Sequence, residues 1–206
     1  MTEWEVAGML ASACARKKID AIVQLIAADE RCDTVRHPLP TSKIITSRVM
    51  VVLCGRREGL IVSLTRVASF VPLSAELVAR HEAVTYVDAV ILAQLKEDAV
   101  ASEIFSKAVA AYAEKGYANE WTYHHQGGCA GYLGREWFAS PQSQKRVRPS
   151  QGFAWNPSIA GTKSEDTVLL LPSGGVEVIS ASPEWPVITQ TVDGRTFDRP
   201  AILELC

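Results

Sequence analysis

The first 28 residues carry apolar side chains at helical spacing. Thr2 and Glu5 stand three residues apart, the pattern of a capping box at a helix start. The apolar positions that follow at i, i+3 and i+4 spacing are Val6, Met9, Leu10, Ala13 and Cys14. We therefore predict a helix over residues 2–28. The apolar run 21–26 is also compatible with a strand, and the pattern leaves this alternative open.

Two further stretches have the same helical spacing. One covers residues 74–94, and the other covers residues from about 102 to 115. Gly116 follows the second stretch, and glycine is a frequent residue just beyond the last turn of a helix. The pattern predicts two more helices in the middle of the chain.

Runs of β-branched residues separated by turn residues predict strands. Residues 49–54 and 60–67 are two such runs, and the segment 56–59 between them has the polar and glycine composition of a hairpin turn. Three more strands are predicted at residues 152–156, 167–171 and 176–179. Helices and antiparallel hairpins that come in separate blocks are typical of an α+β fold rather than of a parallel βαβ sheet.

No low-complexity linker divides the chain, so a single domain over residues 1–206 is the simplest organisation. Residues 29–42 hold charges and prolines and are expected to form a loop, as is the glycine-rich segment 123–135. The tail after Pro183 is rich in proline, and we expect it to pack as an arm.

Composition narrows the function classes. With 48% hydrophobic and 21% charged residues, the 206-residue chain is of ordinary globular composition. A net charge of −2 gives no field for a nucleic acid, and the short basic run 144–148 is typical of a solvated loop. No apolar run reaches membrane-spanning length, so we expect a cytoplasmic location and no membrane partner. The five cysteines form no CxxC pair, which argues against a zinc knuckle.

Four segments together resemble the creatinase/aminopeptidase family, whose members include methionine aminopeptidase, prolidase, Xaa-Pro aminopeptidase and creatinase. The first is RHPLPT, similar to the family's substrate-side histidine loop, and the second is the hairpin that ends GLIVSLTR. The third is HQGGCAG followed by Arg135-Glu136, where the family has Gly-His-Gly-x-Gly and then His-Glu. The fourth is GFAWNPS followed by SEDTVL. The segments begin at Arg36, Val51, His125 and Gly152, in family order.

The resemblance covers residues 1–182 and implies the pita-bread fold. In that fold a curved antiparallel sheet is flanked by helices, and the two halves are related by a pseudo-two-fold axis. Larger family members carry an additional N-terminal domain, which we expect this chain to lack. The resemblance also implies a homodimer, the commonest closed assembly of soluble proteins.

The family's chemistry uses two divalent metals held by two aspartates, a histidine and two glutamates, and the metals activate a bridging water. Read onto this chain, the first four ligand positions fall on Leu53, Ser63, Gly128 and Asn156. Only the last glutamate is kept, as Glu165. One carboxylate with neutral oxygens is too little charge for two dications. We therefore expect no metal and no other cofactor.

Several retained residues are candidates for a metal-independent site. His37, on the histidine loop, is the candidate general base, because a neutral imidazole accepts a proton near pH 7. His125 is a second candidate, and Glu165 is the expected anchor of a cationic or polar substrate end. Candidates for substrate contacts are Arg135, Glu136, Ser63, Asn156 and Trp155. We expect His37, Ser63, His125, Asn156 and Glu165 to border one cavity.

Three functions are compatible with these residues. The first is a metal-independent hydrolase of a small C–N bond substrate, as in creatinase. The second is a non-catalytic pseudopeptidase that binds a small molecule, a peptide or a protein. The third is an active metal-dependent Xaa-Pro-type aminopeptidase, which the missing ligands oppose. The residues favour neither of the first two over the other.

Overall fold

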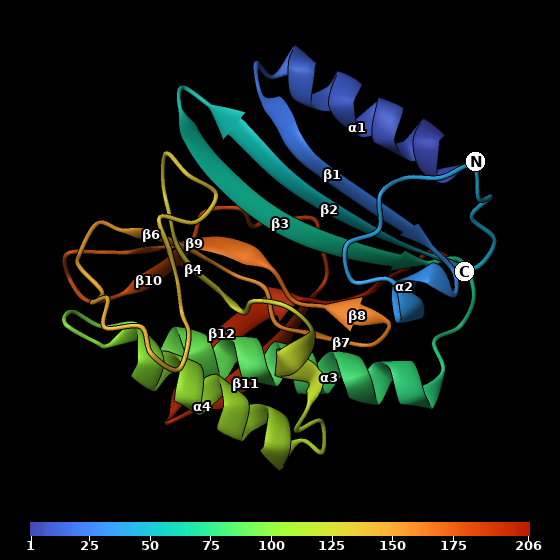
Figure 1. Cartoon of the computed structure of the whole chain (residues 1–206). Coiled ribbons are helices and arrows are strands. Elements are labelled where there is room, and N and C mark those ends of the chain that lie inside the picture. Colours follow the sequence, from blue (N-terminus) through green and yellow to red (C-terminus); the bar gives the residue numbers. More distant parts are fainter.

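The computed structural model describes residues 1–206 and has the α+β architecture expected from the pattern (Figure 1). Its helices are α1 (Glu3–Arg16), α2 (Arg31–Thr34), α3 (Ala75–Ala93), α4 (Ala101–Glu114) and the 3₁₀ helix η1 (Glu120–Tyr123). Its strands are β1 (Asp20–Ala28), β2 (Arg48–Arg57), β3 (Leu60–Ser69), β4 (Gly127–Ala130), β5 (Trp137–Phe138), β6 (Gly152–Trp155), β7 (Ser158–Ile159), β8 (Thr162–Lys163), β9 (Asp166–Leu170), β10 (Val176–Val178), β11 (Val187–Val192), β12 (Arg195–Pro200) and β13 (Leu203–Glu204). None of the helices combines the length and the apolar composition that crossing a membrane requires.

The first sheet has the strand order β1-β2-β3-β13 and is antiparallel except for the last pair. The long curved strands β1 to β3 run between α1 on one side and the rest of the molecule on the other (Figure 1). The β2–β3 hairpin closes through Glu58 and Gly59, which both have positive φ. A two-residue turn of this kind matches the twist of the flanking strands. The turn predicted at residues 56–59 is found but is shorter, because Arg56 and Arg57 still pair with β3.

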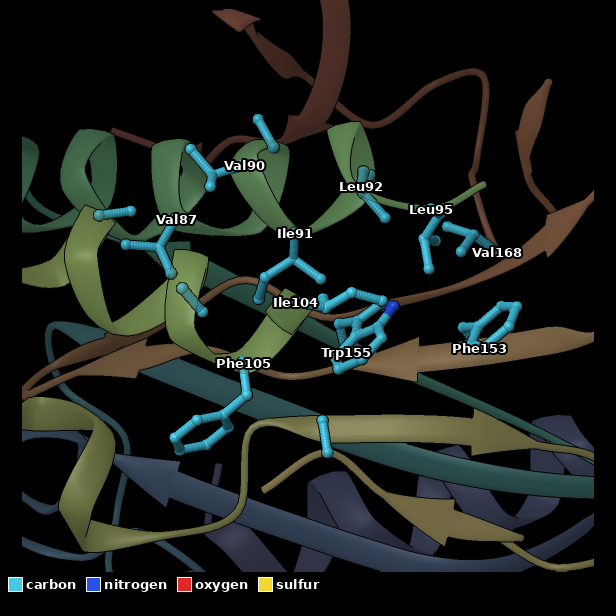
Figure 2. Close-up of a cluster of buried hydrophobic side chains, with 14 of the residues drawn as sticks. Val87, Val90, Ile91, Leu92, Leu95, Ile104, Phe105, Phe153, Trp155 and Val168 are labelled. Carbon is cyan, nitrogen blue, oxygen red and sulfur yellow. The ribbon is translucent and has the colours of Figure 1, made fainter. Parts of the chain in front are cut away.

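The second sheet has the order β10-β9-β6-β4-β5 and is antiparallel throughout. Its strands lie beside β3, and the helices α3 and α4 cover its other side (Figure 1). Ile91 of α3 and Ile104 of α4 lie next to Trp155 of β6, and Val87 and Phe153 belong to the same cluster (Figure 2). This cluster is the larger core of the molecule, and it fixes the positions of the strands that carry the candidate site.

Two predictions of local structure are corrected. The helix expected over residues 2–28 ends at Arg16, and residues 20–28 form β1, the alternative that the pattern left open. The capping box at Thr2 and Glu5 is present. The tail after Pro183 is not an arm: it forms the hairpin of β11 and β12, which packs on α3, and then adds β13 to the edge of β3. The pseudo-two-fold relation of the two halves stays a prediction.

A buried ionic network holds the C-terminal hairpin to the body. Arg199 of β12 is 1% exposed, and its guanidinium bonds Asp88 of α3 at 2.8 Å and Asp166 of β9 at 3.1 Å. Arg66 of β3 pairs with the other oxygen of Asp166 at 2.9 Å. Two carboxylates thus face two guanidinium groups, so the network is balanced in charge. Burial raises the pKa of Asp88, against the charge of Arg199.

Candidate functional site

Three of the positions assigned to the family's metal ligands lie where β3 packs against the second sheet. They are Ser63, Asn156 and Glu165. Trp155 and Asp166 form the last pair of the β6–β9 ladder, and Asn156 and Glu165 adjoin that pair just beyond the strands. The Thr65 amide donates to the Glu165 carbonyl at 3.0 Å, which sets β3 beside this row. Two residues away, the Ser63 amide donates to the Thr167 hydroxyl of β9 at 2.8 Å, and that hydroxyl donates to the Ser63 carbonyl at 3.0 Å. Because side chains alternate along a strand, Ser63 and Thr65 face the same side.

Leu53 is not part of this constellation, which corrects the expected register. In the β2–β3 ladder Leu53 is paired with Leu64, whereas Cys54 is paired with Ser63. Paired residues of an antiparallel ladder share a face, and their neighbours point to the other one. The Ser63 hydroxyl donates to the Cys54 Sγ at 3.1 Å. The residue of β2 that belongs to the site is therefore Cys54, whose thiol pKa burial raises.

Glu165 lies at the centre of a buried ion cluster, hereafter the Glu165 cluster, formed with Lys163 and Arg135. The Lys163 Nζ is 2.7 Å from one carboxylate oxygen, and the Thr65 hydroxyl donates to the same oxygen at 2.6 Å. An Arg135 Nη is 3.5 Å from the other oxygen. Burial is the largest influence on the pKa of Glu165 and raises it, but the charges of Lys163 and Arg135 outweigh it, and the pKa is lowered.

The Glu165 carboxylate already has hydrogen-bonding and ionic partners within the chain, and this changes the role expected for it. Its two oxygens already face an ammonium group, a guanidinium group and a hydroxyl group of the chain itself. A cationic substrate end would have to displace one of these internal partners. Glu165 therefore serves to hold Lys163 and Arg135 in place.

Arg135 and Glu136 do not act together. The Arg135 side chain is buried and reaches Glu165, whereas Glu136 is exposed and accepts the Leu133 amide at 3.0 Å. The structure thus places Arg135 in the site and Glu136 in the turn outside it.

Three histidines stand near the Glu165 cluster. His37 and His125 are exposed, and His124 lies between them, 6.1 Å from each by ring centroid. Desolvation lowers the pKa of His125 to about 4, helped by the charges of Arg135 and Lys163. It also lowers the pKa of His37, while the charge of Glu165 acts in the opposite direction. Both rim imidazoles are therefore neutral at pH 7.

The loop that carries His37 is tied to the body on both sides. The buried carboxylate of Glu3 accepts the Thr41 amide at 2.8 Å and the Thr41 hydroxyl at 2.6 Å. Arg36 bonds the Ser158 hydroxyl at 2.8 Å, forms an ion pair with Glu120 and lies over the Tyr123 ring. His124 Nε2 lies 2.6 Å from the same Ser158 hydroxyl. The histidine rim is held by side chains of four separate segments.

Two proposed site positions cannot contribute a side chain to the site. At Gly128 a Cβ would lie 2.1 Å from the Trp137 carbonyl oxygen, so the backbone leaves no room for a histidine there. Trp155 was expected to contact substrate, but its indole is 1% exposed in the core beneath α3 and α4 (Figure 2). It alternates with Asn156 and so points to the opposite face of the sheet.

The grouping of His37, Ser63, His125, Asn156 and Glu165 around one large cavity stays a prediction. The small hollow of about 10 Å³ that Lys163 borders is lined by other residues, among them Arg36, Ser158 and Thr162. Larger grooves lie elsewhere, about 1030 Å³ against α1 and about 410 Å³ beside Trp185.

Sequence reasoning missed Lys163, Thr65 and Cys54. Lys163 stands two residues before Glu165, and residues i and i+2 of an extended segment share a face, so this spacing could have identified it. Thr65 likewise stands two residues after Ser63. The identification of Cys54 depends on the register of the β2–β3 hairpin, and the sequence pattern does not fix that register to within one residue.

The resemblance to the creatinase/aminopeptidase family implies two divalent metals, but the residues present at these positions do not fit them. No three histidine, cysteine, aspartate or glutamate side chains lie close enough together to hold a metal ion. The single carboxylate at the proposed ligand positions is already paired with two cationic side chains. A cation entering this site would meet the positive charges of Lys163 and Arg135 at short range.

Comparison with known proteins finds relatives only by structure. No protein-family model and no curated protein sequence matches the chain. The X-Pro aminopeptidase of Thermotoga maritima superposes with a TM-score of 0.80 at 19% identity, over 100% of this chain and 55% of its own length. The Xaa-Pro dipeptidase of Bacillus anthracis gives 0.80 at 20% identity, over 100% and 55%.

A third similar structure comes from a different kind of protein. The N-terminal domain of the FACT complex subunit SPT16 from chickpea (Cicer arietinum) superposes with a TM-score of 0.67 at 10% identity, over 80% of this chain and 43% of its own length. The chain spans about half the length of the peptidase structures that it matches. At these identities the likeness concerns the fold: the chain has the pita-bread fold found in prolidases and Xaa-Pro aminopeptidases.

Proposed function

We propose that this chain is a metal-independent ligand-binding domain built on the pita-bread fold. The observation that carries the proposal is the Glu165 cluster, in which the two positive charges next to the retained carboxylate come from Lys163 and Arg135. A dinuclear metal site needs several anionic ligands around its cations. Here the charges are reversed, because one anion is surrounded by two cations that belong to the chain.

The surroundings of the cluster support binding over metal-assisted catalysis. The other positions proposed for metal ligands carry a hydroxyl, a carboxamide and a glycine, at Ser63, Asn156 and Gly128.

A metal-independent hydrolase of a small C–N bond substrate is the second candidate, favoured by the neutral imidazole of His37 at the exposed rim. A base is most effective when its pKa lies near the working pH. The lowered pKa of His37, and the pKa of about 4 at His125, make both weaker bases than an ordinary histidine. If the chain is a hydrolase of this kind, His37→Ala lowers the rate by about 10²–10⁴-fold with folding intact.

An assay of hydrolysis separates the two candidates. The purified protein is incubated with Ala-Pro and Gly-Pro dipeptides and with creatine, with and without added Mn²⁺ or Co²⁺. We expect no hydrolysis above the rate of a His37→Ala control in either condition. Turnover that depends on added metal contradicts the proposal, and turnover without metal that His37→Ala abolishes supports the hydrolase candidate instead. The homodimer and the cytoplasmic location stay predictions.

A further inference from the structure

The Glu165 cluster has one positive charge more than its carboxylate balances. Arg135 and Lys163 contribute two positive charges and Glu165 one negative charge, and the three side chains are 7%, 8% and 3% exposed. The neighbouring charges do not supply the missing anion, because Asp88 and Asp166 are matched by Arg66 and Arg199. Arg36 is likewise paired with Glu120. A buried excess charge is unfavourable and attracts a group of opposite sign.

Arg135 also has hydrogen-bonding capacity that the chain does not use. One Nη donates to the Gly134 carbonyl at 2.6 Å, and the other is 3.5 Å from Glu165. The Nε is buried and has no partner. A guanidinium group presents its Nε and one Nη side by side, a fork that matches the two oxygens of a carboxylate. An acceptor of this shape would satisfy both the charge and the unpaired donor.

The side-chain oxygen of Asn156 is a second polar atom near the cluster whose hydrogen-bonding capacity is unused. The Asn156 side chain is 3% exposed, and its Oδ1 has no hydrogen-bond partner. Asn156 and Glu165 directly adjoin the last pair of the β6–β9 ladder, Trp155 with Asp166, just beyond the ends of the two strands. A buried carboxamide oxygen without a donor is costly, and an N–H group would satisfy it.

We propose that the Glu165 cluster binds a carboxylate with an amide N–H beside it, as found in an N-acyl amino acid or at the C-terminal end of a peptide. The carboxylate lies on the Arg135 fork, and the amide N–H donates to Asn156. The remainder of the ligand lies at the exposed rim, where the His125 ring packs against Phe138 with centroids 4.7 Å apart. This inference rests on the proposed metal-independent binding function and names its ligand class.

Calorimetric titration at pH 7 tests the proposal with matched pairs of probes. N-acetyl-L-alanine is compared with N-acetyl-L-alaninamide, and an alanine pentapeptide with a free C-terminus is compared with its amidated form. We expect each acid to bind at least about tenfold more tightly than its amide, because the amide lacks the charge that Arg135 pairs with. Binding of both acids indicates a small-molecule ligand, and binding of the peptide acid alone indicates a protein C-terminus.

Substitutions of Arg135 and Asn156 test whether these two residues bind the ligand. Arg135→Lys keeps the charge and removes the fork, and Asn156→Ala removes the acceptor; each is expected to weaken acid binding by about tenfold. Gln24→Ala is the matched control, since the Gln24 side-chain oxygen is also buried without a partner but lies on β1 opposite Leu53. It should leave binding unchanged. Thermal melting of each variant verifies that it is folded, and Asn156→Ala keeps the test decisive if Arg135→Lys unfolds.

Two outcomes overturn the inference. Acid and amide that bind equally tightly exclude recognition of a carboxylate, and a metal-free protein that binds neither acid excludes the ligand class. Either result leaves the proposed binding function standing. Metal-dependent hydrolysis of the dipeptides would instead overturn the proposed function itself, and with it this inference.

Discussion

The Lys163 ammonium group lies 2.7 Å from a Glu165 carboxylate oxygen, and both side chains are more than nine-tenths buried. Removing one partner of a buried pair leaves a charge without compensation. We predict that Lys163→Met lowers the free energy of unfolding by about 3 kcal/mol. Urea denaturation measures this change. The exposed pair of Arg56 and Asp20 gives the control, because Arg56→Gln should cost about 0–1 kcal/mol.

A double-mutant cycle extends this prediction. Glu165→Gln removes the charge that Lys163 compensates, so the variant carrying both changes should be more stable than the sum of the single losses implies. Additive losses would show that the two side chains do not interact, which is incompatible with the role given to the pair.

Arg199 anchors the C-terminal hairpin through Asp88 and Asp166. Arg199→Met leaves two buried carboxylates with less compensation, and we predict a loss of about 3–5 kcal/mol in the free energy of unfolding. Arg195→Met, on the exposed side of the same hairpin, should change it by less than about 0.5 kcal/mol. Equal effects of the two substitutions would show that the buried network does not hold the hairpin.

Buried neutral histidines make stability depend on pH. Burial lowers the pKa of His81 to about 4, and its Nδ1 lies 2.6 Å from the Thr162 hydroxyl. Between pH 6.5 and about 4 the unfolded state binds a proton that the folded state does not. Stability is therefore fully present above pH 6.5 and falls as the pH is lowered through this range.

Urea denaturation at pH 7, 5.5 and 4.5 measures the slope. His81→Gln removes this proton and should reduce the loss between pH 7 and pH 4.5, although His124 and His125, with lowered pKa values, retain part of it. A slope that is unchanged in His81→Gln would contradict the assignment.

The sequence pattern predicted the elements whose signals are local. The helices at 74–94 and 102–115 are found as α3 and α4, and the hairpin around Gly59 is found as β2 and β3. The spacing of apolar residues and the turn composition suffice for such elements. The strand β1 was ambiguous, because its pairing with β2 decides between helix and strand.

The site depends on relations that no local pattern contains. A shift of one residue in the hairpin register exchanges Leu53 for Cys54 and turns the side chain to the other face. The place of Arg135 depends on a turn that directs it inward while Glu136 points outward. The Glu165 cluster brings together β8, the segment between β8 and β9, and the loop before β5, and only the folded chain reveals its charge balance.

Metal content after exposure to metal tests the central claim most directly. The protein is purified, incubated with excess Mn²⁺, Co²⁺ or Zn²⁺, dialysed and analysed for bound metal. Because Lys163 and Arg135 supply the positive charge beside Glu165, we predict no stoichiometric metal, and chelators should leave the thermal stability unchanged. About one or two ions per chain, as a dinuclear site would hold, would contradict the account.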